Sequence, residues 1–339
     1  MKNKPKLKFK GNFLILIIIT IIVMILALKD DFNDMLDILV KVNIGWLLVA
    51  LILMIAYWGF RAISIIIFAR KFNNHYKAKD GMELVIATQF FNAITPFASG
   101  GQPFQVYMLT KNKIKTNEAI NVVAVNFICY QIALVFMGLM AILSNHLFHI
   151  FAKVSLLQQL VTIGFIVNVS VIVLTLVLVF SKQFNKRIAK WCIIVLNKIK
   201  IIKNREETIK KVNDKLGEFH KSGKILLQNK KDFILCIVYN VISISCLYLV
   251  PLAVIFSIGN YHSINAFTTV ICSSYTLMMG SFVPLPGGTG GIEFGFIKFF
   301  GNFLNGAILK TLMLMWRFLT YYFGMFLGAI TFNLMERRK

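Results

Sequence analysis

Two stretches rich in proline and glycine, TPFASGGQP (residues 95–103) and PLPGGTGG (284–291), interrupt long apolar segments of the chain. Hydrocarbon does not tolerate unpaired backbone N–H and C=O groups. Irregular backbone at membrane depth therefore persists only where protein buries it or where it lines a watery cavity. Paired breaks in corresponding places of two halves are typical of transport proteins, whose binding sites lie between them. The two loops predict a membrane protein that moves or holds something polar, rather than a soluble enzyme.

The composition indicates the same class. Of the 339 residues, 58% are hydrophobic, whereas soluble domains are about 45–50% apolar. The net charge of +23 is also found in nucleic-acid-binding proteins. Here, however, the lysines gather in loops that flank apolar segments, where anionic lipid and the positive-inside rule account for them. We expect no nucleic-acid partner. The five cysteines and five histidines show no metal-ligand spacing, so no metal site and no cofactor is predicted.

Windows of about 20 apolar residues predict full membrane spans. Six such windows cover residues 12–28, 44–69, 118–143, 159–181, 233–257 and 309–334. The first follows five lysines and could be a signal peptide, but no small-x-small cleavage site comes after it. We therefore interpret it as a retained signal anchor.

The distribution of basic residues predicts the orientation of these spans. Thirty of the 37 Lys and Arg residues lie in five segments, whereas the loops between the remaining span ends hold only three. The five segments are the N-terminus and residues 70–79, 111–115, 182–232 and 337–339. By the positive-inside rule, both termini and the 182–232 segment are expected in the cytosol of a multi-pass bacterial plasma-membrane protein.

The same count predicts how the interrupted segments run. Residues 81–110 lie between two basic loops, and residues 265–304 lie between two loops of low charge. Each is expected to enter and leave the membrane on one side, the first from inside and the second from outside. The predicted fold is thus an all-α polytopic bundle of about six full spans with two oppositely oriented re-entrant hairpins, an inverted repeat whose tips meet near the midplane. The alternative is that each stretch is one long tilted span.

The chain is predicted to form a single transmembrane domain, residues 1–339, with 182–232 as a basic cytosolic insert. Within the insert, basic and apolar residues alternate at helical spacing: Arg187, Lys190, Lys198 and Lys203 among Ile188, Trp191, Ile194 and Val195. This pattern is typical of an amphipathic helix on an anionic leaflet. A merely solvated connector, with lysines that fix topology, is an equal alternative.

Few ionisable residues remain inside apolar segments, where they are costly and often functional. Arg61 lies within the second predicted span, and Glu293 follows the second loop, with Lys298 and Arg317 beyond it. Glu293 is a candidate partner for an arginine or for a cationic head group, or it simply caps its helix. The two arginines could bind a lipid phosphate. Snorkelling for Arg61 and a structural pair with Glu293 for Arg317 are the alternatives.

The loops themselves offer backbone N–H groups at helix N-termini, which bind anions without any side chain. Their glycines also allow the chain to reverse and helices to approach closely, so a purely structural role is an alternative. Neutral polar side chains accompany both loops: Gln89, Asn92, Ser99, Gln102 and Gln105 at the first and Thr289 at the second. No Gly-Lys-Ser/Thr follows, so the second loop is not a nucleotide-binding P-loop.

Both loops resemble the signature segments of one family. TPFASGGQPFQVYML (95–109) and PLPGGTGGIEFGF (284–296) are similar to those of the lysylphosphatidylglycerol synthase transmembrane family, the membrane half of the bacterial multiple-peptide-resistance factor. Residues matching the two segments are Pro96, Gly100, Gly101, Gln102 and Pro103, and Pro284, Pro286, Gly287, Gly288, Gly290, Gly291 and Glu293. The resemblance implies that the membrane half flips lysylphosphatidylglycerol outward. In full-length relatives a separate cytosolic domain makes this lipid from lysyl-tRNA, and that domain is expected to be absent here.

The leading hypothesis is therefore a lipid translocase that moves an aminoacylated or anionic phospholipid and contributes to resistance against cationic antimicrobial peptides. Alternatives are a phosphatidylglycerol lysyltransferase and a membrane scaffold for a separately encoded lipid synthase. Phospholipids, and such a synthase, are the expected partners, and oligomers are compatible with the sequence. The candidate lipid-binding residues are Arg61, Gln89, Asn92, Pro96, Ser99, Gly100, Gly101, Gln102, Pro284, Pro286, Gly287, Gly288, Thr289, Gly290, Gly291, Glu293 and Arg317.

Overall fold

The computed structural model describes residues 38–151, 155–198, 205–281 and 283–338. Within these ranges the chain is helical and contains no strand. In chain order the elements are α3 (Ile44–Ala69), α4 (Ala78–Ala93), η1 (Pro96–Ala98), α5 (Gly101–Lys111), α6 (Thr116–Phe148), α7 (Ser155–Phe180), α8 (Lys182–Lys198), α9 (Arg205–Gln228), α10 (Lys230–Ser257), α11 (Ala266–Gly280), η2 (Pro286–Gly288), α12 (Gly291–Phe300), α13 (Gly306–Arg317), η3 (Phe318–Tyr322) and α14 (Phe323–Arg337).

Five of the described helices are long and apolar enough to cross a membrane: α3, α6, α7, α10 and the continuous rod α13–η3–α14. They coincide with five of the six predicted spans, so the all-α polytopic class is confirmed. The predicted span at residues 12–28 lies outside the described residues. An 18-residue apolar window in one helix satisfies all its backbone groups internally, which is why the hydropathy signal locates these helices well.

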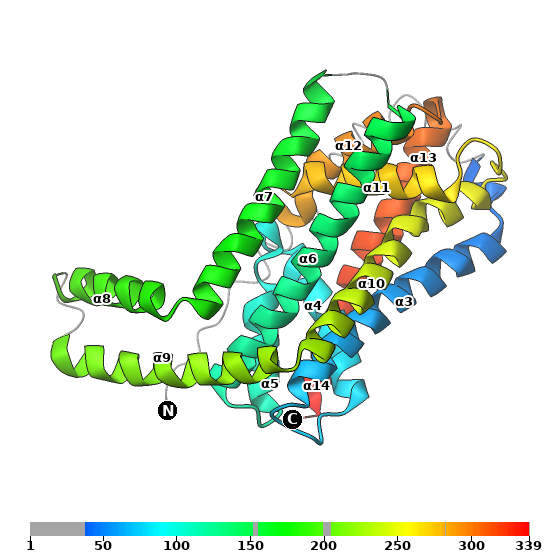
Figure 1. Ribbon diagram of the computed structural model, residues 1–339. Helices are drawn as coiled ribbons and strands as arrows, with labels where there is room; N and C mark the ends of the chain where they lie inside the picture. The colour runs from blue at the N-terminus through cyan, green and yellow to red at the C-terminus, as the bar shows by residue number, and fades with distance from the viewer. Residues whose placement is uncertain (1–37, 152–154, 199–204, 282, 339) are drawn as a thin grey trace.

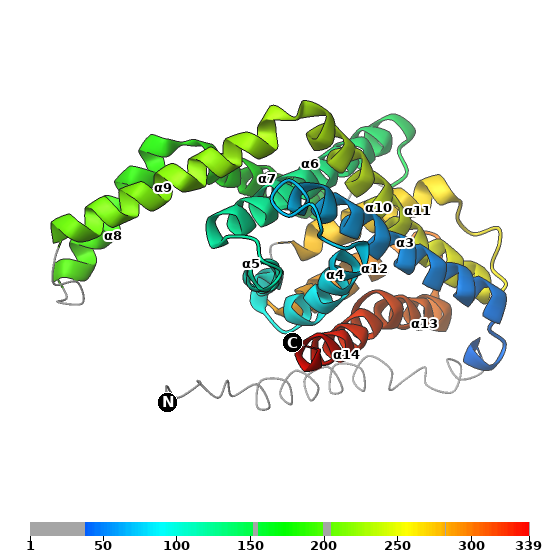
Figure 2. The same cartoon turned by 90° about the horizontal axis from the view of Figure 1, so that it is seen from below.

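The two proline- and glycine-rich loops are the tips of two helical hairpins. The hairpin α4–η1–α5 occupies the lower half of the bundle and α11–η2–α12 the upper half (Figure 1), so the two run in from opposite ends. Seen from below (Figure 2), α4 and α5 lie between α6 on one side and α14 on the other. The tips η1 and η2 contact each other. The alternative of a single tilted rod in each place does not hold, since both stretches reverse direction.

The two halves of the bundle form a repeat with a constant offset. Pro96 and Pro286, the first residues of the two tips, are 190 positions apart. When 190 is added to the residue numbers of α5 and α6, their first residues coincide with the first residues of α12 and of the rod α13–η3–α14. The same shift brings the start of α3 to within a few residues of the start of α10. After each proline, two residues adopt the left-handed region: Phe97 and Ala98 (φ 52° and 51°), and Gly287 and Gly288 (φ 65° and 62°). The two tips therefore share one backbone conformation.

Polar contacts in the apolar interior fix how the central helices pack. Ser64 on α3 donates to Asn126 Oδ1 on α6 (2.7 Å) and accepts from Asn240 Nδ2 on α10 (3.0 Å). All three side chains are buried. Ser243 on α10 donates to the carbonyl of Tyr57 (2.8 Å). Because a buried polar group without a partner is costly, these bonds specify one register for α3, α6 and α10.

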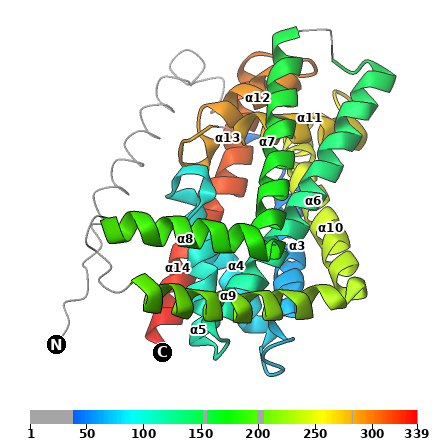
Figure 3. The same cartoon turned by 60° about the vertical axis from the view of Figure 1, so that its left-hand side comes forward.

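The 182–232 segment forms two helices, α8 and α9, that lie across the bundle rather than along it (Figure 3). Asn121 Nδ2 on α6 anchors α9 through the carbonyl of Phe219 (2.7 Å) and Ser222 Oγ (2.9 Å). On α8, Trp191 is 66% exposed. The part of the predicted amphipathic segment that is described, up to Lys198, is therefore helical. Lys203 lies outside the described residues. The cytosolic position of this segment stays a prediction.

Candidate functional site

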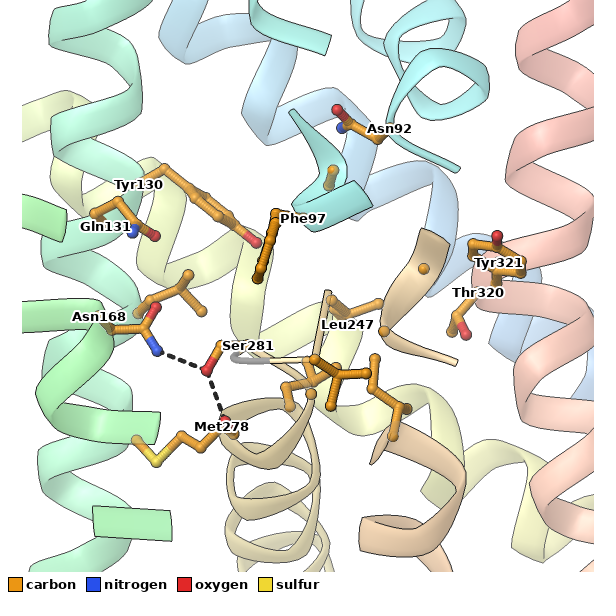
Figure 4. A pocket seen from close by; sticks show the side chains of 18 of the residues that line it. Asn92, Phe97, Tyr130, Gln131, Asn168, Leu247, Met278, Ser281, Thr320 and Tyr321 are labelled. Atoms are coloured by element: carbon orange, nitrogen blue, oxygen red, sulfur yellow. Dashed lines mark hydrogen bonds between the residues drawn. The ribbon is translucent and has the colours of Figure 1, made fainter. Parts of the chain in front are cut away.

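A cavity of about 950 Å³ lies where the two hairpin tips meet in the middle of the bundle (Figure 4). Its wall combines residues of α3, α4, α6, α7, α10 and α11 with both tips and the α13–η3 junction. Eight of the predicted site residues line it: Arg61, Gln89, Asn92, Ser99, Gln102, Gly287, Gly288 and Arg317. Segments more than 250 residues apart in the sequence thus meet at one space.

The other nine predicted residues do not line this cavity: Pro96, Gly100, Gly101, Pro284, Pro286, Thr289, Gly290, Gly291 and Glu293. Several of them shape the tips instead. Thr95 Oγ1 accepts from the N–H of Gly100 (2.8 Å), and Thr289 Oγ1 donates to the carbonyl of Pro286 (2.7 Å). These bonds satisfy loop backbone that has no helical partner. The interpretation of the loops as devices for reversing the chain therefore fits these residues.

Gly287 joins the second tip to the opposite wall. Its φ is +65°, and a Cβ atom there would lie 2.2 Å from the ring of Tyr321. Tyr321 cannot retreat freely, because its hydroxyl donates to the carbonyl of Ala93 at the end of α4 (2.9 Å). The absence of a side chain at Gly287 thus permits a contact that couples the second tip to the first hairpin.

Gly287→Ala is expected to lower the free energy of unfolding by about 2–4 kcal/mol, through strain at positive φ and displacement of Tyr321. Gly259→Ala is the matched control, since Gly259 also has positive φ (79°) but has no atom within 4 Å of the place that an added Cβ would take. Thermal unfolding in detergent measures both. Equal losses for the two variants would contradict the contact with Tyr321.

Glu293 and Arg317 form a partly buried ion pair beside the cavity, in which Arg317 is buried and Glu293 is half-buried. Arg317 Nε donates to Glu293 Oε1 (2.6 Å), and the other carboxylate oxygen accepts from the N–H of Gly290 (2.7 Å). Arg317 also donates from Nη2 to the carbonyl of Gly287 (3.1 Å). The guanidinium carbon lies 4.7 Å from the ring centroid of Tyr321. Both charges are therefore compensated inside the protein, and the pair holds the second tip against α13.

Arg61 stands in a different environment. Its Nη1 donates to the hydroxyl of Tyr57 (2.8 Å), and its guanidinium carbon lies 4.3 Å from the ring centroid of Tyr130. Within the described part of the chain, no Asp or Glu pairs with it. A guanidinium has five N–H donors in a planar fork, and one of them is used in the hydrogen bond to Tyr57. Arg61 therefore brings an uncompensated positive charge with spare donors to the cavity wall.

The charge balance of the wall follows from these two arginines. Among the described residues, no Asp or Glu lines the cavity. Arg317 is neutralised by Glu293, so Arg61 gives the space a net positive character. Such a site attracts an anion that can accept hydrogen bonds from a fork, and phosphate has this geometry.

Several lining residues were not identified from the sequence: Tyr57, Tyr130, Gln131, Asn168 and Tyr321. The internal repeat offers a signal that could have identified some of these lining residues. With the offset of 190, Phe127, Tyr130 and Gln131 of α6 correspond to Arg317, Thr320 and Tyr321, and all six line the cavity. The second set lies at a π-helical turn, Phe318–Tyr322. Such turns widen a helix locally and are frequent at functional sites.

The fold and the site together define a multi-pass, all-α membrane protein with an inverted repeat and, between its two halves, a largely apolar cavity that carries polar and cationic side chains. The family model described as "Lysylphosphatidylglycerol synthase TM region" matches residues 13–328. The chain belongs to this family, which confirms the resemblance seen in the two loops. It is also similar to a "UPF0104 membrane protein" of Archaeoglobus fulgidus, with 23% identity over 312 residues, 85% of this chain and 87% of that protein.

Proposed function

We propose that the protein is a lipid translocase, which moves a phospholipid head group between leaflets through the cavity between the hairpin tips. The lipid would be anionic or aminoacylated, as with phosphatidylglycerol or lysylphosphatidylglycerol, and its acyl chains would remain in the bilayer. Substrate sites of transporters with inverted repeats lie where broken helices of the two halves meet. The tips η1 and η2 meet in this way, beside the cavity.

The observation that carries the proposal is Arg61, an uncompensated guanidinium on the wall of a cavity of about 950 Å³. A cation at such a site is costly without a partner. A lipid phosphate would supply that partner and accept two hydrogen bonds from the fork. Tyr57 and Tyr130 would hold the guanidinium in place from the other side.

In this proposal Glu293 has a structural role and does not bind the lipid. Both of its carboxylate oxygens have internal partners, Arg317 and the N–H of Gly290. A third partner, such as the amine of a lysyl group, would have to share with Arg317 the single negative charge of this carboxylate. We therefore assign Glu293 and Arg317 to positioning the second tip, and Arg61 to the phosphate.

The proposal includes an orientation of the protein in the membrane. The basic segments at residues 70–79, 111–115 and 182–232 favour a cytosolic position for that end of the bundle and for both termini, in the plasma membrane. The first hairpin would then open from the cytosol and the second from outside. Outward movement of a cationic lipid would protect against cationic antimicrobial peptides, and a separately encoded synthase would supply that lipid.

Reconstitution into proteoliposomes tests the proposal. Fluorescent phosphatidylglycerol placed in the inner leaflet should reach the outer leaflet faster with the protein than in protein-free vesicles, as measured by dithionite quenching. Rates equal to those of empty vesicles, across anionic and aminoacylated lipids, would refute translocation. Formation of lysyl lipid from phosphatidylglycerol and lysyl-tRNA by the purified chain would favour the transferase alternative instead.

A further inference from the structure

We propose that helix α8 is a binding site for anionic phospholipids at the membrane surface, with acyl chains in the angle between α7 and α8 and phosphates on the lysines of α8. This site is separate from the cavity between the hairpin tips, and it does not depend on translocation through that cavity. Four features carry the inference: the length of α7, an exposed apolar face and a basic face on α8, and an apolar groove between the two helices.

The length of α7 places α8 at the edge of the hydrocarbon layer. The apolar part of α7, Leu157–Val179, has 23 residues. At about 1.5 Å per residue it is about 35 Å long, enough to cross a hydrocarbon layer of about 30 Å with some tilt. Helix α8 begins at Lys182, three residues after this segment ends, and lies across the bundle rather than along it (Figure 3). It therefore starts where the apolar layer ends and continues at the level of the head groups.

One face of α8 is apolar and open. Phe184, Ile188 and Trp191 have the spacing i, i+4 and i+7, which places them on one side of a helix. Helix α9 packs along α8, yet Ile188 remains 40% and Trp191 66% exposed. An exposed tryptophan within an apolar stripe is typical of helices that lie in the membrane interface, where the ring suits the boundary between hydrocarbon and water.

This apolar face continues onto the lipid-facing side of α7. A groove of about 440 Å³ lies in the angle between the two helices, and it is lined by Phe184 of α8 and by Val169, Ser170, Val173, Leu174 and Val177 of α7. None of these six residues lines the cavity between the hairpin tips. Only 11% of the apolar window of α7 is buried inside the protein, so hydrocarbon chains must cover most of this span. The same chains reach the groove and Phe184, which makes an acyl chain its natural occupant.

The opposite face of α8 is basic. Lys182, Lys186 and Lys190 follow one another at intervals of four residues, and all three are exposed. The 17 residues of α8 include five basic ones and no Asp or Glu. Among the described residues, no acid forms an ion pair with these three lysines. Lysines close to an anionic leaflet strengthen its binding roughly in proportion to their number, and their long stems bring the ammonium groups to lipid phosphates.

Two other interpretations of α8 account for fewer of these features. A merely solvated connector explains the lysines but not an exposed Ile188 and Trp191 beside an apolar groove. An acidic protein partner also matches the lysines, but it would not fill a groove that is continuous with the surface of a membrane span. Anionic phospholipid matches the charge and the apolar face together.

The fluorescence of Trp191 tests where α8 lies. The full chain is reconstituted into nanodiscs of phosphatidylcholine with brominated acyl chains, which quench tryptophan on contact. The chain has four tryptophans, so the signal of Trp191 is the emission that Trp191→Phe removes. We expect lipids brominated near the glycerol end of the chain to quench this signal most strongly. No quenching at any depth would overturn the proposal, because α8 would then lie in water.

The same discs test the charge of the lipid. A minor fraction of brominated phosphatidylglycerol in unbrominated phosphatidylcholine should quench Trp191 about threefold more than an equal fraction of brominated phosphatidylcholine. High salt should reduce this excess. Equal quenching by the two lipids in the unaltered protein would overturn the preference for anionic lipid, whether or not any variant folds.

Lys186→Gln/Lys190→Gln should remove the excess quenching by phosphatidylglycerol and leave the quenching by phosphatidylcholine intact. Lys221→Gln/Lys224→Gln is the matched control, since it removes the same charge from exposed positions of α9 and should keep the excess. Equal losses in the two double variants would refute the assignment to α8.

The outcomes separate this site from the proposed function. Contact of α8 with anionic lipid, without lipid movement in proteoliposomes, would refute translocation and support the site. Lipid movement without such contact would refute the site and leave the proposed function standing.

Discussion

Replacing Glu293 by glutamine should lower the free energy of unfolding by about 2–4 kcal/mol, somewhat less than the loss when one partner of a fully buried ion pair is removed. Arg317 is 5% exposed, and its Nε atom donates to Glu293 Oε1 at 2.6 Å. Glutamine keeps the size of the side chain but leaves a buried guanidinium without a counter-charge. The second hairpin tip would lose the contact that holds it against α13, and unfolding temperature in detergent measures the loss.

Glu118→Gln is the matched control for the capping part of this effect. Glu118 also accepts a hydrogen bond from the backbone N–H three residues earlier, that of Lys115 (3.2 Å), at the start of α6. It is half-buried and forms no ion pair with the described residues. We expect a loss of about 0.3–1 kcal/mol there.

The double variant Glu293→Gln/Arg317→Met should recover much of the stability, because it removes the uncompensated charge as well. A Glu293→Gln loss no larger than that of Glu118→Gln would show that the carboxylate only caps its helix. Recovery in the double variant with no lipid movement would place the pair in the transport cycle as well as in the fold.

The hairpins were predictable because hydrocarbon leaves so few choices for backbone polar groups. Pro96 and Pro286 lack an N–H, and each is followed within five residues by glycines, a combination that favours a break in an apolar helix. Charge counts in the flanking loops then fix the side from which each hairpin enters. Both inferences use local sequence only. The structure confirms two hairpins that run in from opposite ends, and the side that faces the cytosol stays a prediction.

The walls of the cavity were harder to predict. Tyr130 and Gln131 lie on α6, whose apolar residues surround the helix almost evenly, so no periodicity identifies the inward face. Polar residues in such a helix serve the interior contacts, as Asn126 does with Ser64 (2.7 Å), or line the cavity. Which of the two applies depends on how the helices pack, and the sequence of one helix does not contain that information.

The two arginines illustrate the same limit. The sequence presents Arg61 and Arg317 as equal candidates for a phosphate ligand, and only the packing separates them. The α12–α13 turn brings Glu293 onto Arg317, whereas the neighbours of Arg61 on the cavity wall are tyrosines. The structure thus contains the ion pair between Arg317 and Glu293 that the sequence offered as the alternative to phosphate binding. Among the described residues, Arg61 is left as the cation at the cavity that has no acidic partner.

Arg61→Gln should therefore reduce lipid movement by about 10- to 100-fold, the equivalent of roughly 1.5–3 kcal/mol for hydrogen bonds to a charged group. Glutamine brings no charge for a phosphate, and its amide ends two bonds short of Nη1, the atom of Arg61 that bonds Tyr57. Arg61→Lys keeps the charge and loses the planar fork, so an intermediate rate is expected. Stability should change little, since the variant buries no new charge. Proteoliposome assays with fluorescent phosphatidylglycerol, paired with unfolding temperatures, measure both quantities.

Arg187→Gln supplies the comparison, because Arg187 is an exposed arginine on α8 that does not line the cavity. It tests whether the loss of any positive charge slows transport through weaker attraction of anionic lipid to the protein surface. If Arg61 binds the phosphate within the cavity, high salt will reduce the rate of the unaltered protein only modestly, since burial limits screening. Equal rates for Arg61→Gln and Arg187→Gln would exclude Arg61 as the phosphate ligand, and lipid recognition would then have to come from the backbone N–H groups of the two tips.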